Sequence, residues 1–125
     1  MKTVLVADDE VGMQKLYQRE LSREGYNVVC VSSAQEAIRK TQESAPDLVI
    51  MDIRMPGMDG IEGMNRILEA NNEIPVVINS AYSSYKDSFL SWSAEAYVTK
   101  SSDLSELKAT VRQILSKDKK AEAIV

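Results

Sequence analysis

Histidine is absent from this chain of 125 residues, and cysteine occurs only once. Without histidine the sequence cannot supply Ser-His-Asp or Cys-His catalysis, histidine-ligated zinc or a phosphohistidine carrier. The single cysteine, Cys30, cannot form an internal disulfide, which is typical of a protein from a reducing compartment. Because Cys30 lies in an apolar run, we expect it to be a small buried residue. The chemistry left to this chain is that of carboxylates, lysines and hydroxyls.

The sequence also lacks long apolar runs and an excess of positive charge. No apolar run approaches the ~20 residues that a membrane-spanning helix needs. The N-terminal segment reaches Asp8 and Asp9 too early for a signal peptide. The net charge is −4 and the isoelectric point is near 4.9, so we expect no direct binding of nucleic acid by this domain. We therefore expect a cytoplasmic protein with no membrane segment.

Five short apolar runs rich in Val and Ile alternate with helical patterns. The runs cover residues 3–7, 27–31, 47–51, 75–79 and 96–99. Their almost continuous apolar character is typical of parallel strands that are buried on both faces. Apolar residues recur every three or four positions within 13–21, 34–41, 61–68 and 104–115, and a Ser-rich segment over 83–93 gives a fifth, weaker helix. The alternation predicts an α/β fold, a doubly wound five-stranded parallel sheet with five helices.

Local signals agree with these elements. We expect Gly25 to end the first helix, Asp59 to cap the helix that begins at Gly60, and Ser102 or Asp103 to cap the last helix. We expect one domain over residues 1–117, followed by a C-terminal tail or the start of a linker over 118–125.

Polar or charged residues stand at the ends of four of the five predicted strands. They are Asp8 and Asp9 after the first strand, Asp52 after the third, Ser80 after the fourth and Lys100 after the fifth. Each has an ordinary structural explanation when it is taken alone, as a helix cap, a turn residue or a surface lysine. In open parallel sheets, however, sites form beyond the C-terminal ends of the strands. The coincidence of these residues at equivalent strand ends predicts a shared site.

Charge balance at this site favours a divalent cation. Two carboxylates about 4 Å apart repel by roughly 4 kcal/mol at an effective dielectric near 20, and one lysine cannot neutralise three of them. An all-oxygen ligand set is typical of Mg²⁺, whereas zinc and copper prefer histidine and cysteine. Mg²⁺, the Lys100 ammonium and the Ser80 hydroxyl could each bind one oxygen of a phosphoryl group in transfer. A carboxylate could then act as the nucleophile and become an aspartyl phosphate.

The sequences around these residues resemble a known family. The stretches are VLVADDE (residues 4–10), DLVIMDIRMPGMDG (47–60), SA (80–81) and AYVTK (96–100). In combination they resemble the receiver domain of response regulators in two-component signalling, over residues 2–117. The resemblance implies the chemotaxis-protein-like, flavodoxin-like fold with strand order 2-1-3-4-5.

The resemblance also implies a role for each site residue. Asp52 would be the phosphoacceptor, with Asp8, Asp9, Asp52 and the backbone carbonyl of Arg54 holding Mg²⁺. Lys100 and Ser80 would bind phosphoryl oxygens, and Ser80 and Tyr97 would form the switch. The phosphoryl donor would be a sensor histidine kinase or a histidine phosphotransfer protein. The domain would not be a conventional enzyme, but would catalyse its own phosphorylation and a slow autodephosphorylation.

The output implied by the family is a change of surface shape. The surface comprises the helix expected over 83–93, the strand over 96–99 and the last helix, and it would act on a downstream output protein or a C-terminal output domain. The sequence identifies neither the kinase nor the output partner, and it leaves open whether phosphorylation dimerises the domain.

Two local features leave details open. The family often has a proline after the lysine, joined by a cis peptide, whereas Ser101 follows Lys100 here, so the sequence does not decide between cis and trans. Arg54 and Tyr82 lie two residues beyond Asp52 and Ser80, at positions that gate water in the family. The lifetime of the phosphoryl group would therefore depend on them.

Two other functions remain as alternatives. A small phosphatase of the haloacid dehalogenase type would use Asp8 as its nucleophile and Glu10 as a second carboxylate. A receiver-like interaction module without phosphorylation would use the fold alone.

Overall fold

The computed structural model describes residues 1–81 and 93–124, with side chains described up to residue 116. The helix that the sequence predicts over 83–93 lies outside this range except for Ser93, and so does Tyr82. Within the described residues, no helix is both long and apolar enough to cross a bilayer.

A single parallel sheet forms the centre of the molecule. Its strands are β1 (Thr3–Ala7), β2 (Asn27–Val31), β3 (Leu48–Met51), β4 (Val76–Ser80) and β5 (Ala96–Thr99). They lie in the order β2-β1-β3-β4-β5, and every neighbouring pair is parallel. The predicted strand order is therefore confirmed. The predicted bounds agree with the structure except that β3 and β4 each begin one residue later and β4 ends one residue later.

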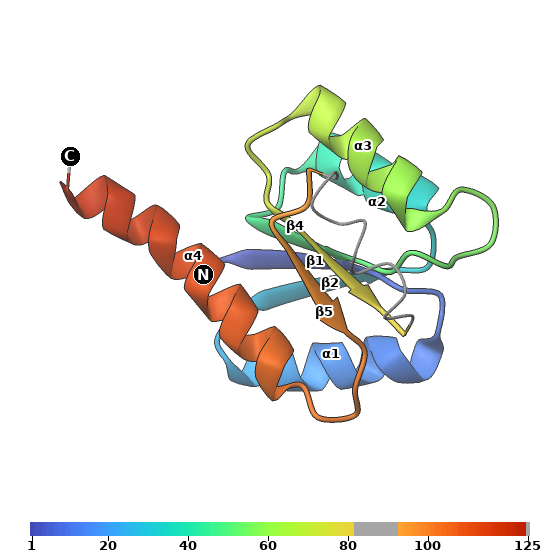
Figure 1. Ribbon diagram of the computed structural model, residues 1–125, viewed down its shortest axis with the longest axis horizontal. Coiled ribbons are helices and arrows are strands. Elements are labelled where there is room, and N and C mark those ends of the chain that lie inside the picture. Colours follow the sequence, from blue (N-terminus) through green and yellow to red (C-terminus); the bar gives the residue numbers. More distant parts are fainter. Residues whose placement is uncertain (82–92, 125) are drawn as a thin grey trace.

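Helices cover both faces of this sheet. The part of the chain that the structure describes contains α1 (Val11–Arg23), α2 (Ala34–Glu43), α3 (Gly60–Ala70) and α4 (Ser105–Ile124). In Figure 1, α2 and α3 lie on one side of the sheet and α1 and α4 on the other. The doubly wound architecture is confirmed. The backbone of α4 continues to Ile124, so it is helical over 118–124, where the sequence suggested a tail or linker.

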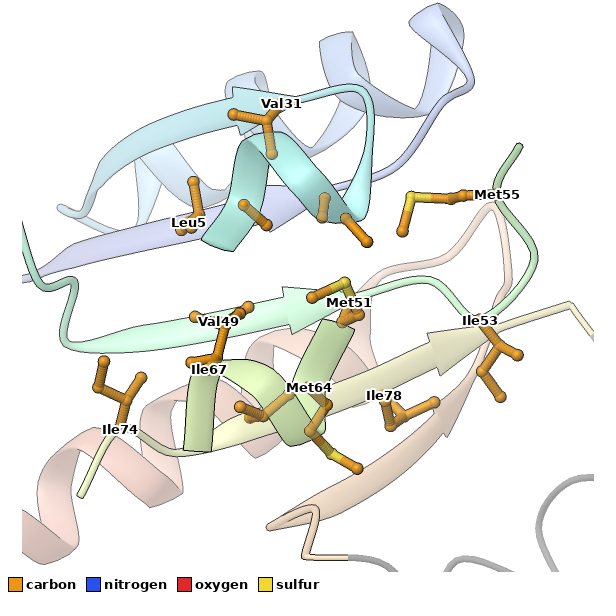
Figure 2. Close-up of a cluster of buried hydrophobic side chains, with 14 of the residues drawn as sticks. Leu5, Val31, Val49, Met51, Ile53, Met55, Met64, Ile67, Ile74 and Ile78 are labelled. Atoms are coloured by element: carbon orange, nitrogen blue, oxygen red, sulfur yellow. The ribbon is translucent and has the colours of Figure 1, made fainter. Parts of the chain in front are cut away.

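The core has two layers because successive strand residues point to opposite faces of the sheet. Figure 2 shows the layer under α2 and α3, where Leu5, Val49, Met51 and Ile78 meet helix residues such as Met64. The opposite layer packs α1 and α4 on the sheet and contains Val4, Val6, Tyr17, Leu21, Leu48, Ile50, Val77, Val98, Leu107 and Val111. Both layers bury the strands, which explains why the strand sequences lack polar alternation.

The helix-end signals act largely as predicted. Gly25 follows α1 with φ of +95°, and its N–H donates to the carbonyl of Ser22 at 3.0 Å. The Asp59 carboxylate accepts from the backbone N–H of Glu62 at 2.9 Å and caps α3. At α4, Asp103 Oδ1 accepts from the N–H of Ser105 at 2.9 Å.

Cys30 differs from its prediction. It is half-buried rather than buried, with Sγ 3.7 Å from the backbone oxygen of Gln14. Its strand, β2, is an edge strand of the sheet, so its helix-facing side is only partly covered.

Candidate functional site

The polar residues at the strand ends lie at one edge of the sheet. Asp8 and Asp9 follow β1, Asp52 follows β3, Ser80 is the last residue of β4, and Lys100 follows β5. Because these four strands are neighbours and run parallel, their C-terminal ends meet at that edge. The shared site that the strand ends predict is therefore a feature of the structure.

Backbone hydrogen bonds just past the strand ends fix the positions of the backbones that carry these residues. The N–H of Asp52 donates to the carbonyl of Ala7 at 3.0 Å, and the N–H of Asp8 donates to that of Val31 at 3.1 Å. The N–H of Lys100 donates to the carbonyl of Ser80 at 2.7 Å. The ladder thus holds the backbones of Asp8, Asp52 and Lys100 directly, without an intervening flexible loop.

The Lys100 ammonium is the centre of the site. Its Nζ lies 2.8 Å from Oδ2 of Asp8 and 3.1 Å from Oδ2 of Asp52. The side chains are nearly inaccessible, with exposed fractions of 9% for Lys100, 2% for Asp8 and 7% for Asp52. Glu10, whose side chain is exposed, approaches the same ammonium at 3.5 Å. One cation is therefore shared among three carboxylates.

The pKa shifts follow from this crowding. Burial raises the pKa of Asp52, and the nearby Asp8 and Asp9 carboxylates add to the rise, while Lys100 acts against it. Burial alone would lower the pKa of Lys100, but its close contacts with the Asp8 and Asp52 carboxylates outweigh burial and raise that pKa above its usual range. Lys100 is thus held as a cation, and the carboxylates around it still carry an excess of negative charge.

Three carboxylates at this edge could hold a metal ion together. Asp8, Asp9 and Asp52 each offer one oxygen, and these oxygens lie within 4.8 Å of one another. Oδ1 of Asp8 accepts from the backbone N–H of Glu10 at 2.9 Å, which fixes the carboxylate plane. Oδ2 is buried and has a close ionic neighbour in Lys100, but no donor aligned for a hydrogen bond. An oxygen in this state, within an all-oxygen set, fits a hard divalent cation.

Close packing of Gly60 against the backbone constrains the position of Asp52. Gly60, the first residue of α3, packs so closely on the Asp52 backbone that a Cβ at this position would lie 1.9 Å from the Asp52 carbonyl oxygen. The N–H of Gly60 donates to the carbonyl of Ile53 at 2.8 Å. The loop after β3, which begins with Asp52, is therefore held directly against the start of α3. This contact was not predicted from the sequence.

Arg54, Ser80 and Tyr97 complete the set of predicted site residues. Arg54 is exposed in the loop that follows Asp52, whereas Ser80 and Tyr97 are buried on β4 and β5. The peptide between Lys100 and Ser101 is trans, which answers the question that the sequence left open.

Sequence reasoning missed two contributors to the site. Glu10 ends the VLVADDE stretch and was considered as the second carboxylate of a phosphatase, but it was not predicted to contact Lys100, which it approaches at 3.5 Å. Asn79, a buried amide within an apolar strand, accepts a hydrogen bond from the Tyr17 hydroxyl. A polar residue inside an otherwise apolar strand is the signal that could have identified Asn79.

Solved structures of high similarity come from response regulators. TrrA from Thermotoga maritima, crystallised in complex with Mg²⁺-BeF, is 38% identical, with a TM-score of 0.87 over 91% of this chain and 99% of that one. A chain from a crystal structure of the histidine kinase ThkA in complex with TrrA is also 38% identical, with a TM-score of 0.85 over 92% of this chain and 99% of that one.

Sequence comparison gives the same family. The alkaline phosphatase synthesis transcriptional regulatory protein PhoP of Bacillus subtilis is 34% identical over 91% of this chain, which spans 48% of PhoP. The chain thus spans about half the length of that relative, and only 26% of the transcriptional regulatory protein ZraR of Escherichia coli. The sequence model of the response regulator receiver domain matches residues 4–112. With its fold, acidic cluster and lysine in place, the chain belongs to the response regulator receiver domain family.

Proposed function

We propose that this domain accepts a phosphoryl group on Asp52 and acts as a phosphorylation-dependent switch in a two-component phosphorelay. The observation that carries the proposal is the close contact of the largely inaccessible Lys100 ammonium with both Asp8 and Asp52, with the Asp9 carboxylate at the same edge. The complex of TrrA with Mg²⁺-BeF and the complex of ThkA with TrrA support it, because TrrA is 38% identical to this chain.

The oxygen set is suited to Mg²⁺. The carboxylates of Asp8, Asp9 and Asp52, together with the backbone carbonyl of Arg54, would hold the ion. Mg²⁺ supplies positive charge that offsets the carboxylates and the oxygens of an incoming phosphoryl group. The buried Oδ2 of Asp8, which lacks an aligned hydrogen-bond donor, supports this assignment.

Asp52 acts as the nucleophile in the proposed reaction. One of its oxygens attacks the phosphorus of a phosphohistidine on the donor, the P–N bond breaks, and its electron pair stays on the imidazole nitrogen. Lys100 pairs with the charge on one equatorial oxygen, and the Ser80 hydroxyl donates to another. Water later attacks the phosphorus of the acyl phosphate, which releases inorganic phosphate and restores the Asp52 carboxylate. The domain is then a slow autophosphatase.

The switch follows from the added charge. Phosphorylation adds about one negative charge beside Lys100, which must divide its contacts between Asp8 and the new phosphoryl oxygens. Ser80 is the last residue of β4, and Tyr97 is buried on the neighbouring β5. We assign the switch to these two residues, and the output surface to the helix predicted over 83–93 together with β5 and α4. A partner must bind the two states with different affinity for this change to carry a signal.

The proposed phosphorylation of Asp52 also implies the partners. The donor is a sensor histidine kinase or a histidine phosphotransfer protein, in the cytoplasm. Because the chain spans about half of PhoP, the output is carried either by a separate protein or by a further domain. Binding of nucleic acid is not assigned to this domain, which carries a net charge of −4.

Intact-mass analysis with acetyl phosphate and Mg²⁺ tests this function. We expect the wild-type protein to gain one phosphoryl group, and Asp52→Asn to gain none. Asp59→Asn is the matched control, because Asp59 is an exposed carboxylate near Asp52 that only caps α3. Chelation of Mg²⁺ by EDTA should abolish the adduct on the wild type.

Other outcomes of the same experiment favour the alternative functions. An adduct that survives Asp52→Asn and disappears in Asp8→Asn would favour a phosphatase with Asp8 as nucleophile. The absence of any adduct on the wild type, from acetyl phosphate and from a phosphorylated kinase, would favour an interaction module without phosphorylation.

A further inference from the structure

A chain of buried hydrogen bonds runs from α1 through β4 to β5, behind the acidic cluster. The Tyr17 hydroxyl donates to Oδ1 of Asn79, and the Nδ2 group of Asn79 donates to the carbonyl oxygen of Val98 at 2.8 Å. Tyr17 and Asn79 are almost fully inaccessible, with exposed fractions of 1% and 3%. The amide of Asn79 therefore uses both its acceptor and its donor side within the protein interior.

These hydrogen bonds lie next to the residues of the site. Asn79 directly precedes Ser80, and Val98 lies two residues before Lys100. The N–H of Lys100 donates to the carbonyl of Ser80 at 2.7 Å, which ties the ends of β4 and β5 together. The Asn79 amide thus crosslinks the two strands just before the residues that present the hydroxyl and the ammonium. Tyr17 ties this crosslink to α1, the helix that follows Asp8 and Asp9.

The charges of the site also act on the Tyr17 hydroxyl. Burial raises the pKa of Tyr17 above its usual range, and the Asp8 carboxylate adds to the rise, while Lys100 opposes it. The raised pKa favours the neutral, donating form of the Tyr17 hydroxyl, which lies within electrostatic reach of Asp8 and Lys100. Glu10 and Asp52 act on it in the same direction as Asp8.

We infer that Tyr17 and Asn79 are positioning residues that hold Ser80 and Lys100 where they meet the oxygens of the phosphoryl group. This inference rests on the proposed function. It assigns neither residue a contact with the phosphoryl group or with the metal ion. Loss of these hydrogen bonds leaves the carboxylates of the site in place. It loosens the Ser80 hydroxyl and the Lys100 ammonium relative to them.

The inference predicts a defect in rate rather than in metal binding. Tyr17→Phe removes the hydroxyl and keeps the ring that fills the core. We expect phosphorylation by acetyl phosphate at saturating Mg²⁺ to slow by about three- to tenfold, the kinetic equivalent of one neutral hydrogen bond. The half-saturating Mg²⁺ concentration should stay unchanged, because Asp8, Asp9 and Asp52 lie outside the hydrogen-bonded chain.

Tyr26→Phe is the matched control, because Tyr26 is half-buried against the same core layer but directly precedes β2, at the N-terminal end of the strand and away from the site. We expect its phosphorylation rate to equal that of the wild type. If the Tyr17→Phe protein loses thermal stability but is phosphorylated at the wild-type rate, the role of these hydrogen bonds is only structural, and the inference is overturned. Failure of the wild type itself to be phosphorylated would instead count against the proposed function.

A second measurement uses the unmodified protein and does not depend on the variant folding. We expect the side-chain amide NMR signals of Asn79 to shift when Mg²⁺ and beryllofluoride, a phosphoryl mimic, are added together, and to shift less with Mg²⁺ alone. Identical Asn79 signals with and without beryllofluoride, while the backbone signals of Ser80 and Lys100 shift, would overturn the inference.

Discussion

Lys100 is the residue on which the acidic cluster depends electrostatically. Its ammonium lies within 3.1 Å of carboxylate oxygens on both Asp8 and Asp52; the two aspartates are buried, and only 9% of the lysine side chain is exposed. Buried ion pairs add little net stability, but removing one partner leaves uncompensated charge in the interior. The two carboxylates would then repel each other with no cation between them.

Replacing Lys100 by methionine should therefore destabilise the metal-free protein by about 3 kcal/mol, the lower end of the cost of breaking a buried ion pair. Mg²⁺ should recover more stability in Lys100→Met than in the wild type, because the ion then meets carboxylates that have no competing ammonium. Denaturant unfolding with EDTA and with Mg²⁺ measures both effects. Equal stabilisation of the two proteins by Mg²⁺ would show that Lys100 and the ion do not share these carboxylates.

At the residue scale, the sequence predicted the site through its strand ends. Asp8, Asp52 and Lys100 could be placed together because parallel strands end at one edge, and the contacts confirm this placement. The closeness of Gly60 to the Asp52 carbonyl could not be predicted, because it depends on how α3 docks on the sheet. The hydrogen bond from Tyr17 to Asn79 was missed for a similar reason, since the spacing of Tyr17 is that of an ordinary core residue.

At the scale of elements, α3 is held against β3 by a contact that excludes any side chain. A Cβ on Gly60 would lie 1.9 Å from the Asp52 carbonyl oxygen and 2.9 Å from the Cα atom of Ile53. Backbone atoms cannot move aside as the end of a flexible side chain can. The start of the helix and the loop that carries Asp52 would have to separate.

Gly60→Ala should consequently lower the free energy of unfolding by about 3 kcal/mol, as expected for severe overpacking, and should slow phosphorylation of Asp52. Gly12→Ala is the matched control, because no atom lies within 4 Å of a Cβ there and the position is in the first turn of α1. It should be neutral or stabilising by about 0.5 kcal/mol. Equal stabilities of the two variants in urea unfolding would contradict the close packing at Gly60.

The two helices on one face of the sheet, α1 and α4, are joined by ion pairs. Lys108 Nζ lies 2.7 Å from Glu20 Oε1, and Arg112 Nη2 lies 2.5 Å from Glu24 Oε1. The hydrogen bond from Lys108 is the largest cause that lowers the pKa of Glu20 below its ordinary value of 4.5, and Arg19 acts in the same direction. Since the folded-state pKa lies below the unfolded one, this stabilisation is complete above the unfolded pKa and disappears as the pH falls through the folded one.

Lys108→Met should move the pKa of Glu20 back toward its ordinary value, because the principal donor is removed. The stability of this variant should also fall less steeply than that of the wild type as the pH drops from about 5 to about 3. An NMR titration of the Glu20 carboxyl measures the first effect. Lys40→Met is the control, since Lys40 pairs with Glu43 within its own helix. An unchanged Glu20 titration in Lys108→Met would refute the coupling.

The elements themselves were largely predictable, because apolar strands and amphipathic helices have different periods. The spacing over 104–115 indicated the last helix, but its continuation to Ile124 could not be predicted, since no apolar stripe follows Leu115. The half-buried state of Cys30 was missed because an apolar run does not reveal whether its strand lies at the edge of the sheet.

For the whole molecule, the acidic edge should couple folding to the metal ion. A ligand that binds only the folded state stabilises it by about 1.4 kcal/mol at ten times its dissociation constant. We expect Mg²⁺ to raise the melting temperature of the wild type in a concentration-dependent way, and to raise that of Asp9→Asn much less. Asp9 suits this test because it is exposed, whereas Asp8 and Asp52 are buried, so its loss should perturb the fold least. Equal responses of the two proteins to Mg²⁺ would remove Asp9 from the proposed ligands.

The central claim is that this arrangement makes Asp52, rather than any other carboxylate, the phosphoryl acceptor. The most direct test phosphorylates the wild-type protein with acetyl phosphate and Mg²⁺, reduces the acyl phosphate with borohydride, and sequences the peptides by mass spectrometry. Because reduction converts a phosphorylated aspartate to homoserine, we predict homoserine at position 52 and aspartate at positions 8 and 9. Homoserine at position 8 or 9, with aspartate intact at position 52, would contradict the account.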